Sequence, residues 1–77
     1  MQYDKDKVDD YTLALMYLVF HGDKHATRAW KGFDWDTLDR LHEKGFIADP
    51  KGKAKSVIMT DEGVKNAEEL FMKFFAK

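Results

Sequence analysis

Three lysines at alternate positions form the part of this sequence best suited to contact a charged partner. Lys51, Lys53 and Lys55 follow a turn segment, and Arg28 and Lys31 lie in a second basic segment upstream. Lysine and arginine contacts to phosphates supply most of the sequence-independent affinity of a DNA-binding protein. All five residues are therefore candidate phosphate contacts. The alternative is that the lysines only keep an exposed hairpin from pairing with other strand edges.

A helix expected between these two basic segments would hold the residues closest to the bases. In helix-turn-helix proteins the N-terminal residues of the second helix reach base edges. Thr37 and Arg40 occupy such positions, and an arginine can read a guanine. Asp34, Asp36 and Asp39 would repel the phosphate backbone. The acidic helix therefore favours protein contact over sequence-specific DNA contact.

Aromatic side chains gather beside the upstream basic segment. Trp30, Phe33 and Trp35 surround Lys31, and aromatic residues dominate binding hot spots. Core packing of at least two of the three is the simpler interpretation. We expect Trp30 to be the partly exposed one.

A second apolar group crowds the C-terminus. Phe74 and Phe75 are adjacent and cannot both face one narrow core, and Leu70 and Phe71 precede them. Exposed apolar patches mark interfaces, and homodimers are the commonest assemblies. We expect these four residues and Tyr11 to form an interface with a second copy of the chain. The alternative is a monomer whose last helix packs back over the first.

Residues for catalysis are scarce. The chain has no Cys, and Ser56 is its single Ser. No Gly-rich phosphate loop is present, and a domain this small has little room for a substrate pocket. We expect a protein that is not an enzyme and that needs no cofactor.

The histidines suggest a metal site only weakly. His21 and His25 are four residues apart with Asp23 between them, which is the spacing of zinc ligands on one helix. Gly22 is expected to end the helix there, and His42 is the only other histidine. Structural zinc sites normally have four ligands. We therefore expect no metal.

Length and charge restrict the remaining possibilities. Seventy-seven residues form one domain, and the net charge of −1 gives no overall attraction to nucleic acid or anionic lipid. The longest apolar run, residues 13–20, is far shorter than the roughly 20 residues of a membrane span. The first ten residues carry mixed charges, unlike a signal peptide. We expect a soluble, cytoplasmic protein with no membrane partner.

Two helices are expected before the acidic one. The first should run from about Lys5 to Phe20 or His21 and stop at Gly22. Its apolar residues lie on nearly all sides, which predicts a helix buried between neighbours or against a partner. One stripe on it comprises Val8, Tyr11, Leu15 and Leu18. Residues 25–31 could form a short second helix or a loop.

The second half of the chain has clearer signals. Asp34 is a good N-cap for the third helix, and Gly45 can end it. Trp35, Leu38 and Leu41 should face the core. Residues 46–48 and 56–59 are strand candidates joined by a turn at 49–52. Thr60 should cap the last helix.

This order of elements resembles a winged helix. The likeness is strongest from Leu38 to Gly63, through Gly45, Phe46-Ile47, Val57-Ile58-Met59 and Thr60-Asp61-Glu62-Gly63. It resembles bacterial regulators of the multiple-antibiotic-resistance and phenolic-acid-decarboxylase repressor types. The resemblance implies an α+β, mostly helical fold with a two-stranded β-hairpin wing, and dimerisation through terminal helices.

A closer resemblance carries no activity. The segments 30–36, 41–45 and 53–57 resemble a family of short bacterial proteins of unknown function. Taken together, the sequence favours a non-catalytic winged-helix binding module that is homodimeric and contacts protein. The alternative is a small DNA-binding transcriptional regulator that uses the basic hairpin.

Overall fold

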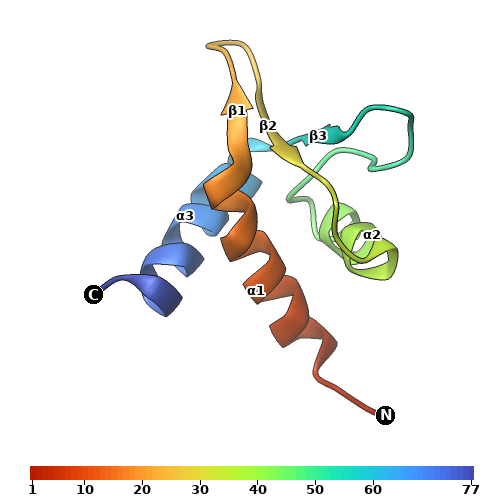
Figure 1. Cartoon of the computed structure of the whole chain (residues 1–77), viewed down its shortest axis with the longest axis vertical. Coiled ribbons are helices and arrows are strands. Elements are labelled where there is room, and N and C mark those ends of the chain that lie inside the picture. Colours follow the sequence, from red (N-terminus) through yellow and green to blue (C-terminus); the bar gives the residue numbers. More distant parts are fainter.

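Three helices and a three-stranded sheet make up the chain, and the computed structural model describes all residues, 1–77. In chain order the elements are α1 (Lys5–Met16), the 3-10 turn η1 (Tyr17–Val19), β1 (Phe20–Gly22), β2 (Thr27–Trp30), α2 (Trp35–Glu43), β3 (Ser56–Ile58) and α3 (Asp61–Phe75). Helix α1 lies between α2 and α3, and the sheet lies at the end of α1 away from the N-terminus (Figure 1). The expected α+β, mostly helical class is confirmed.

The sheet is antiparallel and has the order β1-β2-β3. One row of partners, Phe20, Ala29 and Val57, faces inward: Ala29 and Val57 are buried and Phe20 packs against the core. The expected two-stranded wing differs from this arrangement. Strand β3 pairs with β2. The segment after α2 meets the end of β3 through one bridge, Ile47 to Met59, and through hydrogen bonds from the Ala48 amide to the Ile58 carbonyl at 2.9 Å and from the Thr60 amide to the Phe46 carbonyl at 3.1 Å.

Residues 27–30 form strand β2, so the helix considered at 25–31 is wrong. A turn at Asp23 precedes this strand. The Oδ1 atom of Asp23 accepts hydrogen bonds from the amide of His25 at 2.8 Å and from the amide of Ala26 at 3.3 Å. Gly22 takes a φ of +127°, which a glycine adopts readily. Strand β2 then pairs along both of its edges, whereas a seven-residue helix is marginal without packing.

Pairing also shortens the first helix. Helix α1 ends at Met16 and not at Phe20 or His21, because residues from Phe20 onward join the sheet. With β2 in the place of the second helix, the winged helix-turn-helix interpretation is not confirmed.

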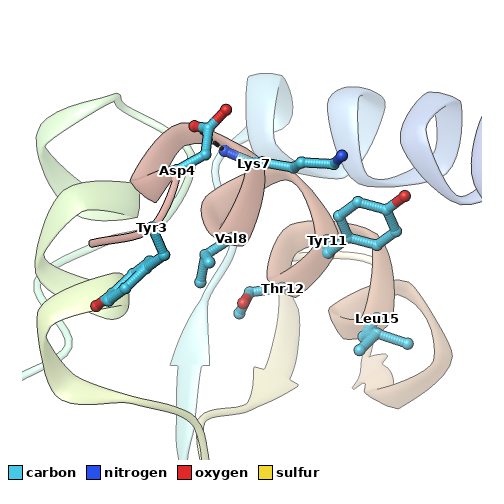
Figure 2. A pocket seen from close by; sticks show the side chains of 7 residues that line it. All are labelled: Tyr3, Asp4, Lys7, Val8, Tyr11, Thr12 and Leu15. Atoms are coloured by element: carbon cyan, nitrogen blue, oxygen red, sulfur yellow. Dashed lines mark hydrogen bonds between the residues drawn. The ribbon is translucent and has the colours of Figure 1, made fainter. Parts of the chain in front are cut away.

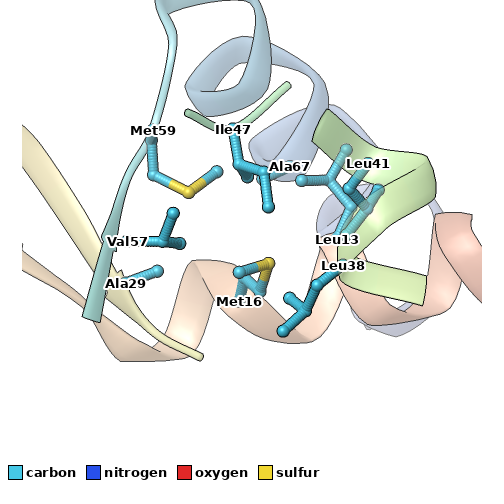
Figure 3. Close-up of a cluster of buried hydrophobic side chains, with 9 residues drawn as sticks. All are labelled: Leu13, Met16, Ala29, Leu38, Leu41, Ile47, Val57, Met59 and Ala67. Carbon is cyan, nitrogen blue, oxygen red and sulfur yellow. The ribbon is translucent and has the colours of Figure 1, made fainter. Parts of the chain in front are cut away.

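The core draws on every helix and on strands β2 and β3. Nine buried side chains form one cluster (Figure 3): Leu13, Met16, Ala29, Leu38, Leu41, Ile47, Val57, Met59 and Ala67. Within the single chain, α1 lies between α2 and α3 but keeps one side exposed, and burial of that side against a partner stays a prediction. Tyr11 and Leu15 are 38% and 41% exposed.

The expected caps of the later helices are confirmed. The Asp34 carboxylate accepts from the amide of Thr37 at 3.0 Å, and the Thr60 hydroxyl accepts from the amide of Gly63 at 2.9 Å. Gly45 ends α2 with a φ of +82°. These local signals position α2 and α3 as the sequence predicts.

A buried carboxylate joins α1 to α2. Asp9 is 1% exposed, and its two oxygens accept from Nε of Arg40 at 2.8 and 3.1 Å. Nζ of Lys44 donates to Asp9 at 2.8 Å and to the exposed Asp6 at the same distance. A buried charge is tolerated only when it is paired in this way.

The exposed end of this cluster has shifted pKa values. Hydrogen bonds to Asp6 and then to Asp9 raise the pKa of Lys44 above its ordinary value of 10.5. The hydrogen bond from Lys44 lowers the pKa of Asp6 below its ordinary value of 3.8. The Lys44 contribution to stability is thus lost only as pH rises through its raised pKa, and the Asp6 contribution only as pH falls through its lowered one. Both are present at neutral pH.

Replacing Gly63 by alanine tests the packing of α3 against the segment after α2. Alanine normally favours a helix over glycine, but here its Cβ would overlap the carbonyl oxygen of Phe46. We expect Gly63→Ala to lower the free energy of unfolding by about 2 kcal/mol or more, as overpacking does. Urea denaturation measures this. The control is Lys65→Ala on the exposed side of α3, which should be near neutral. A Gly63→Ala variant as stable as the parent would contradict the close approach.

Replacing Asp9 by asparagine tests the buried cluster. The change leaves Arg40 and Lys44 without their shared counter-charge, and we expect a loss of about 3 kcal/mol in the free energy of unfolding. The matched control is Asp6→Asn, whose side chain is 86% exposed and should cost much less. Equal losses in the two variants, measured by urea denaturation at neutral pH, would mean that Asp9 has no special role.

Candidate functional site

The lysine loop, residues 49–55, is exposed except at the buried Pro50, and the side chains of Lys31 and Asp49 bond its backbone. Nζ of Lys31 donates to the carbonyls of Pro50 at 2.6 Å and Gly52 at 3.2 Å. The amide of Lys31 also donates to the carbonyl of Lys55 at 3.1 Å. Lys31 therefore fixes the loop, and its ammonium group is already engaged.

The three loop lysines remain available for a ligand. Lys51, Lys53 and Lys55 are exposed, and the ion pairs of the chain involve only Arg40 and Lys44 as cations. Lys51 lines a polar cavity of about 330 Å³ with Asp39, His42, Glu43 and Asp49. Lys53 and Lys55 have no such acidic surroundings and are the freer cations.

The two residues expected to reach bases are not placed to do so. Thr37 is 1% exposed, and its hydroxyl donates to Asp34 at 2.9 Å. Arg40 binds Asp9, and its Nη2 donates to the Thr37 hydroxyl at 3.1 Å. The base-reading interpretation of Thr37 and Arg40 is therefore wrong. The arginine binds an acidic residue that is distant in the sequence, and short-range sequence patterns give no sign of that contact.

Arg28 lies on the outer side of the sheet and is partly engaged. Its Nε donates to the Ser56 hydroxyl at 2.7 Å, and its Nη2 donates to the Ser56 carbonyl at 3.3 Å. The contact joins β2 to β3 and leaves Arg28 half-buried. Its charge still contributes to the outer face.

Two of the three clustered aromatic residues are exposed. Trp30 is 47% exposed, as expected, but Trp35 is 57% exposed, so its expected place in the core is wrong. Trp35 sits in the first turn of α2 beside Lys31, whose Nζ lies 5.8 Å from the ring centroid. Phe33 alone packs against the core. One of the two exposed indoles, that of Trp35, thus lies beside a cation.

The residues expected at a dimer interface lie together where α1 meets α3. The Tyr11 ring stacks on Phe74 at a centroid distance of 4.2 Å and an interplanar angle of 7°. Tyr11 also meets Phe75 edge-on at 6.4 Å. Phe71 contacts the Tyr17 ring at 5.2 Å, and Leu70 packs against the core. Much of this set therefore stabilises the single chain, and Tyr11 and Phe75 remain 38% and 43% exposed.

An apolar face continues from these rings along α1. We call the stripe Val8, Tyr11, Leu15 and Leu18 the α1 stripe. Leu15 is 41% and Leu18 65% exposed. Beside it a groove of about 440 Å³ is lined by Tyr3, Asp4, Lys7, Val8, Tyr11, Thr12 and Leu15 (Figure 2). Leu15, Leu18 and Tyr3 were not among the expected interface residues, although the helical spacing of the stripe was visible in the sequence.

The histidines are separated by the fold. His21 is in β1, His25 is in the turn before β2, and the ring of His42 bonds the carbonyl of Ile47 through Nδ1 at 3.0 Å. No group of three or more His, Asp or Glu side chains is arranged to hold a metal ion. A third cavity, of about 190 Å³, lies between the turn and the start of α3 and is mostly polar.

None of the helices combines the length and the apolar character that crossing a bilayer requires.

Comparison with known proteins identifies a family without an assigned activity. The model of a domain of unknown function, DUF6429, matches residues 4–77. The chain is 52% identical over 77 residues to the uncharacterized protein y4hR of Sinorhizobium fredii, and the match covers the whole of both chains. No solved structure matches the chain. The chain therefore belongs to the DUF6429 family, a family of domains of unknown function.

Proposed function

We propose that this chain is a non-catalytic binding module that acts as a homodimer, with the α1 stripe at its two-fold interface. The observation that carries the proposal is the exposure of large apolar side chains over α1 and the end of α3. Six of them are between 38% and 65% exposed: Tyr3, Tyr11, Leu15, Leu18, Met72 and Phe75. Apolar patches of this kind mark interfaces more often than free surface.

A second copy is the partner that suits this face best. A two-fold interface must be complementary to itself, and the face offers both a groove beside Val8 and protruding side chains such as Leu18. Its rim carries Asp4 and Lys7, so a two-fold axis can pair opposite charges. A standard interface buries about 800 Å² per partner, roughly one seventh of the 5523 Å² surface of the chain.

The polar groups support binding over catalysis. Asp9 is the one buried carboxylate, and its oxygens already accept from Arg40 and Lys44. No buried side-chain nitrogen or oxygen lacks a hydrogen-bond partner. A general base needs a carboxylate or imidazole that can reach a substrate proton, and Asp9 has no such freedom.

The second half of the chain has the order of elements that a winged helix has. Helix α2, the lysine loop, β3 and α3 follow one another as the recognition helix, wing and next helix do in that fold. The resemblance supports dimerisation through terminal helices. Strand β2 stands where the remaining helix of the fold would be, so the resemblance gives little support to DNA reading by α2.

Charge insertion into the α1 stripe tests the dimer. We expect the parent chain to sediment as a dimer at high micromolar concentration. Leu15→Glu and Leu18→Glu should each sediment as monomers, because an interface cannot bury an unpaired carboxylate. Circular dichroism checks that both variants stay folded. The matched control is Ile58→Glu, which places a charge at a 42% exposed residue of β3 and should leave the dimer intact. A parent chain that is monomeric, or a control that dissociates, would sink the proposal.

Duplex DNA binding by the lysine loop is the second candidate. The observation in its favour is the loop itself, where Lys53 and Lys55 are exposed and have no acidic partner. Without Thr37 and Arg40 as base contacts, such a regulator would hold phosphates through the loop, with Arg28 and Lys31 adding charge. Its affinity would be independent of sequence and steeply dependent on salt.

Replacing Lys51, Lys53 and Lys55 together by alanine tests this candidate. Binding to all duplexes should weaken alike, and the slope of log K against log salt should fall by about 0.9 for each phosphate that the variant no longer neutralises. An amide NMR titration at low and physiological salt should place the shifts at residues 51–55. Unchanged affinity in the triple variant would remove the candidate, and Lys65→Ala on α3 is the control.

A further inference from the structure

The outer face of the sheet is open and carries side chains suited to a nucleic acid. Ala29 and Val57 point inward and are buried, so their neighbours along β2 and β3 point outward. The register places Arg28 between His21 and Ile58, and pairs Trp30 with Ser56. Trp30 and Ile58 are 47% and 42% exposed. An aromatic ring, an arginine and an exposed apolar side chain therefore share one face.

Trp30 is held in place on this face. A Cβ built on Gly32 would overlap Nε1 of Trp30 and would lie 2.8 Å from the next ring carbon, Cε2. The indole therefore rests on Gly32 along the edge that carries Nε1. Gly32 has no positive φ, so its lack of a side chain serves this contact. The ring thus rests on the backbone at one edge and is almost half exposed, which suits a stacking platform.

The segments that form this face and the neighbouring loop are rich in positive charge, although the whole chain is slightly acidic. Residues 20–31 and 50–60 hold six of the 13 Lys and Arg residues and one of the 14 Asp and Glu residues. Lys31 fixes the lysine loop next to this face, since its amide donates to the carbonyl of Lys55. Lys53 and Lys55 belong to the last part of the lysine loop, which leads into Ser56, the strand partner of Trp30.

We propose that this face binds single-stranded nucleic acid, with a base stacked on Trp30 and phosphates held by Lys53 and Lys55. Stacking on an exposed ring requires an unpaired base, because the bases of a duplex already stack on one another. A duplex reader of the helix-turn-helix kind would place α2 in the major groove, and α2 presents the exposed acids Asp36 and Asp39. The inference rests on the same lysines as the second candidate function and names its ligand. It is independent of the dimer.

Trp30 lies on this face, and Trp35, the other tryptophan of the chain, lies in the first turn of α2 beside Lys31. Tryptophan fluorescence can therefore report binding once Trp35 has been replaced. The probe is a short oligothymidylate, titrated at low and at physiological salt. In Trp35→Phe, where Trp30 alone emits, we expect saturable quenching with nearly the parent affinity. Trp30→Ala should bind a labelled strand about tenfold more weakly, the usual effect of removing one base–aromatic stack. Gly32→Ala, which keeps the indole but displaces it, should also weaken binding.

The charge contribution is measured separately. Lys53→Ala with Lys55→Ala should lower the slope of log K against log salt by about 1.4, because each single-strand phosphate contact contributes about 0.7. Leu18→Glu should bind the strand as the parent does, even if the dimer has dissociated. Binding of the single strand without binding of a duplex would remove the second candidate function and support this inference.

Four outcomes would overturn the inference. These are no binding of the strand at low salt, full affinity in Trp30→Ala, a duplex of equal length bound at least as tightly, and equal competition by polyglutamate. The last would assign the face to acidic polymers in general.

Discussion

The contact on which the rest of the arrangement depends is the buried carboxylate of Asp9. It accepts hydrogen bonds from two cations of the α2 region while it is 1% exposed. Leaving a buried charge without its partners is costly, so α1 is held in one rotation about its own axis. That rotation places Leu13 and Met16 in the core and turns Tyr11 and Leu15 outward. The ion cluster thus decides which side of α1 is available to a partner.

The same cluster restricts what α2 can do. Arg40 is used inside the molecule, and the exposed side of α2 keeps its acids, Asp36 and Asp39. A surface suited to anions is therefore built by other elements, the sheet and the lysine loop. The apolar face belongs to α1 and the end of α3. Because different elements form the two faces, a change in one need not alter the other.

The sequence predicts the parts of the fold that depend on neighbouring residues. The caps at Asp34 and Thr60 and the turn at Gly45 are local, and each is found as expected. Contacts between distant residues could not be predicted in this way. Strand β2 exists because two other strands pair with it, and Asp9 meets Arg40 across 31 residues. For the candidate site, the lysine loop and the exposure of Trp30 were predictable, whereas the exposure of Trp35 depends on tertiary packing.

The hold of Lys31 on the lysine loop affects how tightly the loop can bind. A free loop of this size loses conformational entropy when a ligand orders it, and that loss subtracts from affinity. Here the carbonyls of Pro50 and Gly52 are already tied to one ammonium group. Most of the ordering has therefore taken place during folding. A ligand meets a loop that is preorganised, and only the lysine side chains still have to become immobile.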